Sequence, residues 1–223
     1  MELAIIFDMD GVLIDSQPLH YEIDMQVLKA CGYAADINTV TPYTGISNPD
    51  RWPKYKENLG LSESVERLIE LAEEKMREIF DSTELVAIEG IPLLLQGIKE
   101  LGLKCGVASS SSHELIQMVL NRTGIAEYFD VLVSGEDVKN GKPAPDIYLK
   151  AAKAVNLPPS RCLAVEDAPA GILAAKKAGF TVFAYRNPNT VGQVFTHADT
   201  VLNEYAECLP IIKNLIKMIG AKA

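Results

Sequence analysis

Phe7-Asp8-Met9-Asp10-Gly11-Val12 ends an apolar run that begins at residue 3, and it is the clearest indication of the fold in this sequence. A short apolar run followed by a glycine favours a buried β-strand. Similar runs recur along the chain, separated by amphipathic segments whose apolar residues lie three or four apart. The runs occupy residues 104–108, 131–133, 162–165 and 181–184, and the amphipathic segments occupy residues 91–101, 114–122, 145–155 and 168–178. This alternation predicts an α/β fold with a parallel sheet covered by helices.

Residues 16–87 interrupt the alternation. They contain no convincing strand, but helical patterns occur at residues 19–31 and 64–80. We therefore expect a Rossmann-like, doubly wound α/β core of residues 1–15 and 88–223, with a small all-helical cap domain of residues 16–87 inserted after the first strand. Two linkers so close to that strand would let the cap hinge over the strand's carboxyl end, where ligands bind in open α/β sheets.

The composition narrows the possible partners. The chain has 48% hydrophobic and 23% charged residues, as ordinary soluble globular proteins do. Its net charge of −9 would repel a polyanion and no basic run overrides it, so we expect no nucleic-acid partner. With no basic leader and no stretch of transmembrane length, we expect neither a signal peptide nor a membrane contact. Four widely spaced cysteines indicate reduced thiols in a cytoplasmic protein: Cys31, Cys105, Cys162 and Cys208.

Asp8 and Asp10 follow the first predicted strand and lie two residues apart. In an extended segment such residues point to the same side. One ionised carboxylate can then attack phosphorus as a covalent nucleophile. The other, kept protonated by burial and by its neighbour's charge, can donate a proton to the leaving group. A pair of solvated loop acids, or a helix cap, is the alternative interpretation.

Glu166 and Asp167 repeat this arrangement after another predicted strand. Carboxylate oxygens are the ligands that Mg²⁺ selects, usually one or two from the protein with water and phosphate completing the octahedron. Asp167 also lies two residues before Pro169, a spacing that suits a helix N-cap. Both interpretations can hold together, so the pair predicts a magnesium site.

Two further segments predict contacts with a phosphate group. Residues 109–112 are four serines between a predicted strand and a predicted helix, where hydroxyls and exposed amides make a phosphate cradle. We expect Ser109, with Ser110 beside it, to bind phosphate and Ser112 to cap the helix. Lys142, in the loop Gly141-Lys142-Pro143-Ala144-Pro145, supplies a cation for the transferring group and for Asp8.

The order of these motifs resembles the haloacid dehalogenase superfamily, and in particular its β-phosphoglucomutase-like branch with a helical cap. The motifs Phe-Asp-Met-Asp-Gly-Val, Gly-Lys-Pro-x-Pro-Asp and Glu-Asp-x-x-x-Gly recur in that branch, and the resemblance spans essentially the whole chain. It implies a Mg²⁺-dependent phosphatase that hydrolyses a small phosphorylated metabolite, such as a sugar phosphate, through an aspartyl-phosphate intermediate.

The resemblance also implies a role for each motif residue. Asp8 is the implied nucleophile and Asp10 the general acid and base, with the Asp10 carbonyl also contacting Mg²⁺. Ser109 and Lys142 would hold the transferring phosphoryl group. The implied metal-site residues are Asp8, Asp10, Asp167 and Glu166, with Glu166 either a direct ligand or an anchor behind the ligands.

A β-phosphoglucomutase, which uses a bisphosphate intermediate, is the alternative function. Relatives of that kind are similar in carrying an arginine in a Gly-x-Ser-Arg segment, whereas this chain has Gly45-Ile46-Ser47-Asn48. An amide has neither the charge nor the fork geometry of arginine, so Asn48 favours hydrolysis. Arg51 could compensate only in a rearranged loop. His20 and Lys75 resemble substrate residues of the mutases, although each is equally interpreted as an ordinary helix residue.

Other hypotheses carry less support from the sequence. A haloacid dehalogenase proper would need neither the second acid after the first strand nor a magnesium site, so Asp10 and the Glu166-Asp167 pair count against it. A non-catalytic binding domain would predict a broken core motif, and none is broken. Trp52 is expected to pack within the cap rather than to face substrate. We expect a monomer or a weak homo-oligomer.

Overall fold

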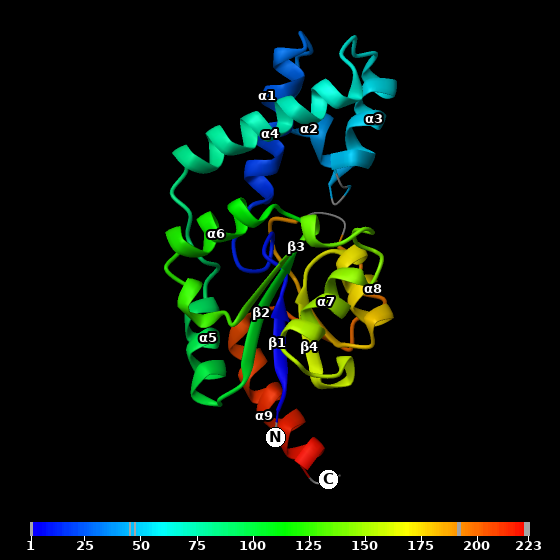
Figure 1. The fold of residues 1–223 in the computed structure, drawn as a ribbon. Coiled ribbons are helices and arrows are strands. Elements are labelled where there is room, and N and C mark those ends of the chain that lie inside the picture. Colours follow the sequence, from blue (N-terminus) through cyan, green and yellow to red (C-terminus); the bar gives the residue numbers. More distant parts are fainter. Residues whose placement is uncertain (1, 45, 47, 191–192, 221–223) are drawn as a thin grey trace. The chain divides into compact units, whose positions relative to one another are not determined.

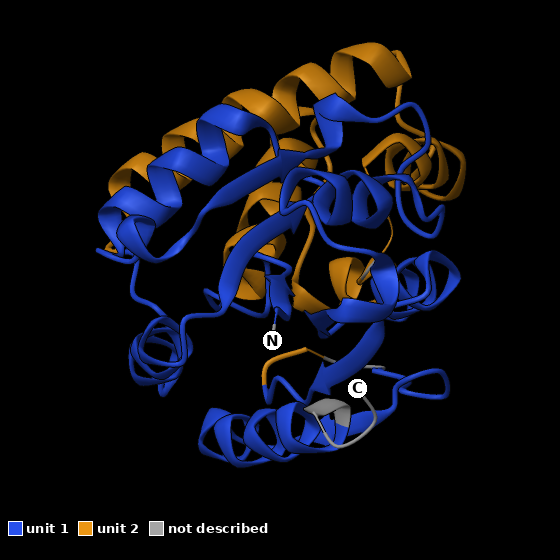
Figure 2. Cartoon of the chain, turned by 60° about the horizontal axis from the view of Figure 1, so that its bottom comes forward, with its two compact units in different colours: residues 1–15, 85–188, 193–223 blue, residues 16–84, 189–192 orange. Residues whose placement is uncertain are grey.

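The computed structural model describes residues 2–44, 46, 48–190 and 193–220. The chain divides into two compact units, residues 1–15, 85–188 and 193–223 and residues 16–84 and 189–192 (Figure 2). The first unit contains a parallel sheet of six strands in the order β3-β2-β1-β4-β5-β6 (Figure 1). The strands are β1 Ala4–Phe7, β2 Lys104–Ser109, β3 Val131–Ser134, β4 Cys162–Glu166, β5 Thr181–Tyr185 and β6 Thr200–Leu202.

The strand order confirms the predicted Rossmann-like fold. From β1 the chain runs outward through β2 and β3, and it then returns to the other side of β1 for β4 to β6. The order therefore reverses between β1 and β4, and in open α/β sheets ligands bind at such a switch point, beyond the carboxyl ends of the strands. All four residues of β1 are buried, as expected for a central strand covered on both faces.

Helices cover both faces of the sheet. α7 and α8 pack on the face that carries Ala4 and Ile6, where they complete a buried apolar cluster. α5 packs on β2 and on α9, and Figure 1 shows these helices on the other side of the strands. The helices of this unit are α5 Ile91–Glu100, α6 His113–Arg122, α7 Asp146–Ala154, α8 Pro169–Ala178 and α9 Cys208–Gly220. Short 3-10 turns lie at Ala126–Tyr128, Gly135–Asp137, Pro159–Arg161 and Tyr205–Glu207.

The second unit is all-helical among its described residues. Its elements are α1 Gln17–Ala30, α2 Ile37–Val40, the 3-10 turn Thr41–Tyr43, α3 Asn48–Leu59 and α4 Val65–Ser82. The Ser64 side chain accepts a hydrogen bond from the Arg67 N–H and thereby satisfies one free donor at the start of α4. Trp52 is fully buried and its ring centroid lies 5.1 Å from that of Tyr55, which confirms that Trp52 packs within this unit.

The boundary between the units differs from the expected one. The first unit resumes at Leu85 rather than at residue 88, and residues 189–192 group with the second unit. Ala87 belongs with the first unit because it forms a β-bridge with Ile14, and the Ile88 N–H donates to the Leu13 carbonyl at 2.9 Å. The separation into two independent domains stays a prediction.

Several elements were not anticipated from the apolar runs. β6 has three residues, too few for a periodic pattern, and it lies at the edge of the sheet. The sequence patterns also do not predict α9, or α2 and α3 in the second unit. No helix in the described part of the chain combines the length and the apolar character that a membrane crossing requires.

Replacing Ile6 by alanine tests the buried centre of the sheet. Ile6 is completely buried in β1, so Ile6→Ala should lower the free energy of unfolding by about 2–5 kcal/mol through lost burial and a residual cavity. Leu93→Ala, at a side chain 72% exposed on α5, is the matched control and should change it by less than about 0.5 kcal/mol. Urea unfolding measures both, and equal costs would contradict the described core.

Candidate active site

The ends of three neighbouring strands bring the chemically active residues together. Phe7 in β1 is in register with Val107 of β2 and with Val165 of β4. The next residue along each strand therefore lies at the same level, which puts Asp8 beside Glu166. The Asp8 N–H donates to the Val165 carbonyl at 2.9 Å and fixes the backbone there. The motifs that follow β1 and β4 thus meet at one edge of the sheet.

Lys142 joins the two acidic motifs. Its Nζ lies 2.9 Å from Asp8 Oδ1 and 2.6 Å from Glu166 Oε1. The ammonium also donates to the Ala108 carbonyl at 3.0 Å, at the end of β2. Burial opposes its charge, but Asp8 and Glu166 outweigh this effect and raise the pKa of Lys142 above its ordinary value. The ammonium is therefore a fixed positive charge at the strand ends.

Asp8, Glu166 and Asp167 form a buried carboxylate cluster. Each offers an oxygen such that these atoms all lie within 4.8 Å of one another, close enough to share a metal ion. The three residues are 8%, 0% and 5% exposed, respectively. Glu166 Oε2 is a buried oxygen with no hydrogen-bond partner in the described part of the chain. Because buried charges require compensation, this donor set fits a hard divalent cation such as Mg²⁺.

The raised pKa of Asp8 indicates that the carboxylate cluster carries an excess of negative charge. Burial raises its pKa most, the charges of Glu166 and Asp10 raise it further, and Lys142 lowers it, with the balance at about 7 compared with an ordinary 3.8. One ammonium therefore does not fully compensate the carboxylates that surround Asp8. A further cation in this site would favour the ionised form.

Two glycines let the carboxylates approach the backbone. Gly11 has φ +76°, which other residues adopt at a cost, and a Cβ at this position would overlap the Asp167 carboxylate. Gly171, in the first turn of α8, has the same relation to Glu166, whose carboxylate would overlap a Cβ there. Glu166 thus lies against the amino end of α8, where the helix dipole favours negative charge.

The four serines at the end of β2 and directly after it, residues 109–112, make different contacts. Ser109 is completely buried and its Oγ accepts from the Ser111 N–H at 3.1 Å. Ser110 is exposed. Ser112 accepts from the Leu115 N–H at 3.3 Å, which confirms it as the N-cap of α6. Ser111, which had no predicted role, donates from Oγ to Asp10 Oδ2 at 3.0 Å. A phosphate-binding role for Ser109 and Ser110 stays a prediction.

The expected N-cap role of Asp167 is wrong. α8 begins at Pro169 with Ala168 as its N-cap residue. A residue before proline is pushed out of the helical region, so Ala168 stays extended and occupies the cap position itself. Asp167 lies before the cap and belongs to the carboxylate cluster.

Two buried side chains at the site were not predicted. Asn187 donates from Nδ2 to the Gly11 carbonyl at 3.0 Å and so supports the loop after β1. The sequence does indicate a site residue here, because Asn187 is a polar residue shortly after the apolar run that forms β5. The Tyr148 hydroxyl donates to Glu166 Oε1 at 2.5 Å. Tyr148 gave no signal, because an aromatic residue at helical spacing looks like core.

The predicted substrate residues of the cap all lie in the second unit. His20, on α1, lies near Phe80, with ring centroids 6.1 Å apart. Lys75, on α4, pairs with Glu78 at 2.5 Å. Asn48 begins α3, and its Oδ1 accepts from Arg51 Nη2 at 2.5 Å. Of the segment 45–48, Gly45 and Ser47 lie outside the described residues. The substrate roles of His20, Asn48 and Lys75 stay predictions.

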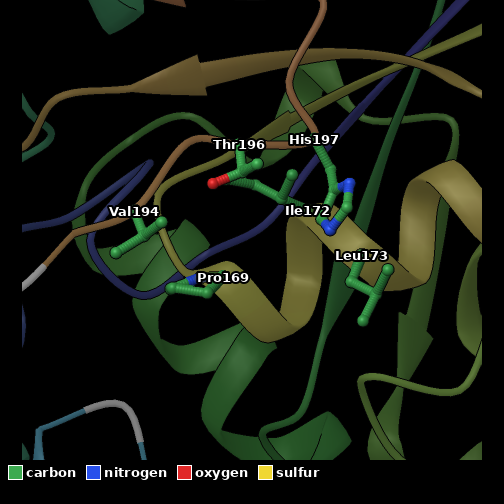
Figure 3. A pocket seen from close by; sticks show the side chains of 6 residues that line it. All are labelled: Pro169, Ile172, Leu173, Val194, Thr196 and His197. Atoms are coloured by element: carbon green, nitrogen blue, oxygen red, sulfur yellow. The ribbon is translucent and has the colours of Figure 1, made fainter.

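A pocket of about 250 Å³ lies between α8 and the segment before β6. Figure 3 shows its lining, which is mostly apolar and consists of Pro169, Ile172, Leu173, Val194, Thr196 and His197. Only Pro169 lies within a predicted motif, at an unspecified position of Glu-Asp-x-x-x-Gly, and no residue of the lining carries a carboxylate. The carboxylate cluster, rather than this pocket, is therefore the candidate active site.

Comparisons with known proteins agree with the motifs. The sequence model of the haloacid dehalogenase-like hydrolase family matches residues 5–185. A phosphorylated carbohydrates phosphatase of Thermotoga maritima is 31% identical over 217 residues, which cover 96% of this chain and 99% of the relative. Among solved structures, a variant of CbbY from Rhodobacter sphaeroides in complex with xylulose-1,5-bisphosphate is similar, with a TM-score of 0.81 and 26% identity, covering 93% of this chain and 96% of that one. A β-phosphoglucomutase from Clostridium difficile has a TM-score of 0.77 and 28% identity, covering 93% of each chain.

The family match runs from within β1 to the end of β5 and includes both acidic motifs, and the relative from Thermotoga maritima matches this chain over nearly its whole length. The expectation of a hydrolytic enzyme and the resemblance drawn from the motifs are both confirmed. The chain belongs to the haloacid dehalogenase-like hydrolase family.

Proposed function

We propose that this protein is a Mg²⁺-dependent phosphatase that hydrolyses a small phosphorylated carbohydrate through an aspartyl-phosphate at Asp8. The observation that carries the proposal is the buried cluster of Asp8, Glu166 and Asp167 with Lys142 bound to the first two. The substrate class rests on relatives whose names refer to phosphorylated carbohydrates and to a sugar bisphosphate.

The first step is attack of an Asp8 carboxylate oxygen on phosphorus. A bond forms between that oxygen and phosphorus, and the ester bond between phosphorus and the sugar oxygen breaks. Asp10 donates its proton to the departing alkoxide. Lys142 lies 2.9 Å from Asp8 Oδ1, so its charge supports the ionised nucleophile and stabilises charge on the transferring group.

The second step regenerates the enzyme. Asp10, now ionised, takes a proton from water as the water oxygen attacks the phosphorus of the aspartyl-phosphate. The bond between Asp8 and phosphorus breaks, inorganic phosphate leaves and Asp8 returns as a carboxylate. The Ser111 hydroxyl, which donates to Asp10 Oδ2 at 3.0 Å, would keep the Asp10 carboxyl oriented between the two steps.

The carboxylate cluster is the proposed holder of Mg²⁺. Asp8 and Asp167 would provide carboxylate ligands, Asp10 its backbone carbonyl, and Glu166 a further ligand or an anchor. When bound, the ion supplies positive charge that neutralises Asp8 and the phosphate oxygens. The raised pKa of Asp8 in this site, about 7, supports the need for such charge. Ser109 and Ser110 would complete the phosphate contacts with Lys142.

β-Phosphoglucomutase is the second candidate, because one of the similar solved structures bears that name. A mutase must hold a second phosphate group. Arg51 is the cation nearest in sequence to Asn48, and it is engaged within the second unit. Its Nη2 lies 3.2 Å from Asp24 Oδ1 and donates to Asn48 Oδ1. An arginine neutralised by a buried carboxylate is a weak phosphate ligand, so hydrolysis stays the preferred proposal.

The nucleophile is tested by Asp8→Asn. Hydrolysis of p-nitrophenyl phosphate and of sugar phosphates in Mg²⁺ should fall by at least about a thousandfold, because an amide cannot form the aspartyl-phosphate. Asp130→Asn is the matched control, since Asp130 accepts from the Cys105 N–H and lies before β3, away from the site. The control should retain activity. Full activity of Asp8→Asn would refute the assignment.

The charge excess predicts a pH dependence of stability without metal. The pKa of Asp8 is raised in the folded state, so its contribution to stability is fully present below pH 3.8 and is lost as pH rises through about 7. The side-chain amide introduced by Asp8→Asn does not titrate in this pH range. In EDTA, the variant should gain stability relative to the unmodified protein by on the order of 2 kcal/mol between pH 5 and pH 8. Urea unfolding at both pH values measures this change, and a constant difference would contradict it.

The choice between hydrolysis and isomerisation is tested with β-glucose 1-phosphate. With Mg²⁺ and glucose 1,6-bisphosphate present, we expect release of inorganic phosphate and no accumulation of glucose 6-phosphate. Asn48 lacks the charge for a second phosphate, which is the physical reason. Formation of glucose 6-phosphate only in the presence of the bisphosphate would show that the protein is a mutase and not a phosphatase.

A further inference from the structure

Tyr148 is a buried phenol beside the carboxylate cluster. It is the third residue of α7 and is completely buried. Its hydroxyl donates to Glu166 Oε1 at 2.5 Å. A phenol carries its proton at neutral pH and a carboxylate oxygen accepts, so the Tyr148 hydroxyl is the donor in this hydrogen bond.

The two oxygens of Glu166 have unequal surroundings. Oε1 accepts from the Tyr148 hydroxyl and from Lys142 Nζ, the latter at 2.6 Å. Oε2 is buried and has no partner in the described part of the chain. Two donors on one oxygen therefore determine the rotation of the carboxylate and leave the other oxygen for a ligand. An unpartnered buried carboxylate oxygen is costly unless something binds it.

The tyrosine ring is itself held in place. Its centroid lies 5.3 Å from Lys142 Nζ and 5.3 Å from the ring centroid of Phe180. Phe180 is buried behind it. The ring thus contacts the same ammonium that pairs with Asp8, while its hydroxyl reaches Glu166. A phenylalanine would fill this space equally well, so packing alone does not explain the hydroxyl.

We propose that Tyr148 is a positioning residue that orients Glu166, so that Oε2 of Glu166 is presented to the Mg²⁺ site. The inference rests on the proposed function, because it assumes that the carboxylate cluster binds Mg²⁺. Neighbours of metal-site carboxylates commonly act in this way, by fixing the ligand's orientation. Tyr148 touches neither substrate nor metal in this role.

The test is Mg²⁺ binding by titration calorimetry, with the full chain and no substrate present. Tyr148→Phe keeps the ring and removes only the donor, and it should raise the Kd for Mg²⁺ by between about tenfold and hundredfold. In EDTA the same variant should still melt in one cooperative transition, somewhat below the unmodified protein because a buried hydrogen bond to a carboxylate is lost. Tyr128→Phe is the matched control, since Tyr128 lies in the Ala126–Tyr128 turn, and its Kd should not change.

A double-mutant cycle separates positioning from general loosening. If Tyr148 acts through Glu166, adding Tyr148→Phe to Glu166→Gln should weaken Mg²⁺ binding much less than it does in the unmodified chain. An unchanged Kd in Tyr148→Phe, or full additivity in the cycle, would overturn the inference. Should Tyr148→Phe not fold, the hydroxyl proton of Tyr148 in the unmodified chain provides the readout. Its downfield NMR resonance should move on addition of Mg²⁺, and a resonance that does not move would overturn the inference.

Calorimetry also distinguishes failure of the proposed function from failure of the role of Tyr148. If the unmodified protein shows no Mg²⁺ binding in calorimetry, the metal site itself is refuted, and the positioning role falls with it. Normal binding by the unmodified protein together with an unchanged Kd in Tyr148→Phe refutes only the role of Tyr148.

Discussion

The ammonium of Lys142, held between Asp8 and Glu166, is the interaction on which the site depends. It contacts an oxygen of each acid and the Ala108 carbonyl, so it joins the ends of β1, β2 and β4. Buried carboxylates repel one another, and one fixed cation lets two of them lie close together. The compensation is incomplete, as the raised pKa of Asp8 indicates. The remaining negative charge would attract a divalent cation in the proposed reaction, and that cation would in turn offset the charge of an anionic phosphate ester.

The fold supplies this arrangement through strand order and register. Because β1 lies between β2 and β4 in parallel register, residues far apart in the sequence reach one edge of the sheet at the same level. Glycines at 11 and 171 then allow Asp167 and Glu166 to approach backbone that any larger residue would block. Tyr148 and Asn187 stabilise the same edge of the sheet. The Tyr148 hydroxyl donates to Glu166, and Asn187 donates to a backbone carbonyl in the loop after β1. The site is thus built on rigid elements, which suits chemistry that relies on positioned charge.

Much of this could be predicted from the sequence, for a physical reason. Acids that directly follow parallel strands must meet at the sheet edge, so the proximity of Asp8 and Glu166 follows once the strands are recognised. Contacts between distant residues without a periodic signal could not be foreseen. The Ile14–Ala87 bridge, which moves the start of the resumed core to Leu85, is one such contact. The hydroxyl of Tyr148 is another, because its residue pattern is that of a buried helix face. The prediction that Asp167 caps α8 is wrong, because Pro169 keeps Ala168 extended and Ala168 takes the cap position.

The role of Asp8 as the nucleophile can be tested by trapping the covalent intermediate. The enzyme, mixed with Mg²⁺ and a sugar phosphate and quenched in acid during turnover, would be treated with borohydride, which reduces an acyl phosphate to an alcohol. Mass spectrometry of the peptides should then find homoserine in place of Asp8, and only in the sample that received substrate. Modification of another carboxylate, or unmodified Asp8 in an enzyme shown to be turning over, would show that Asp8 is not the nucleophile.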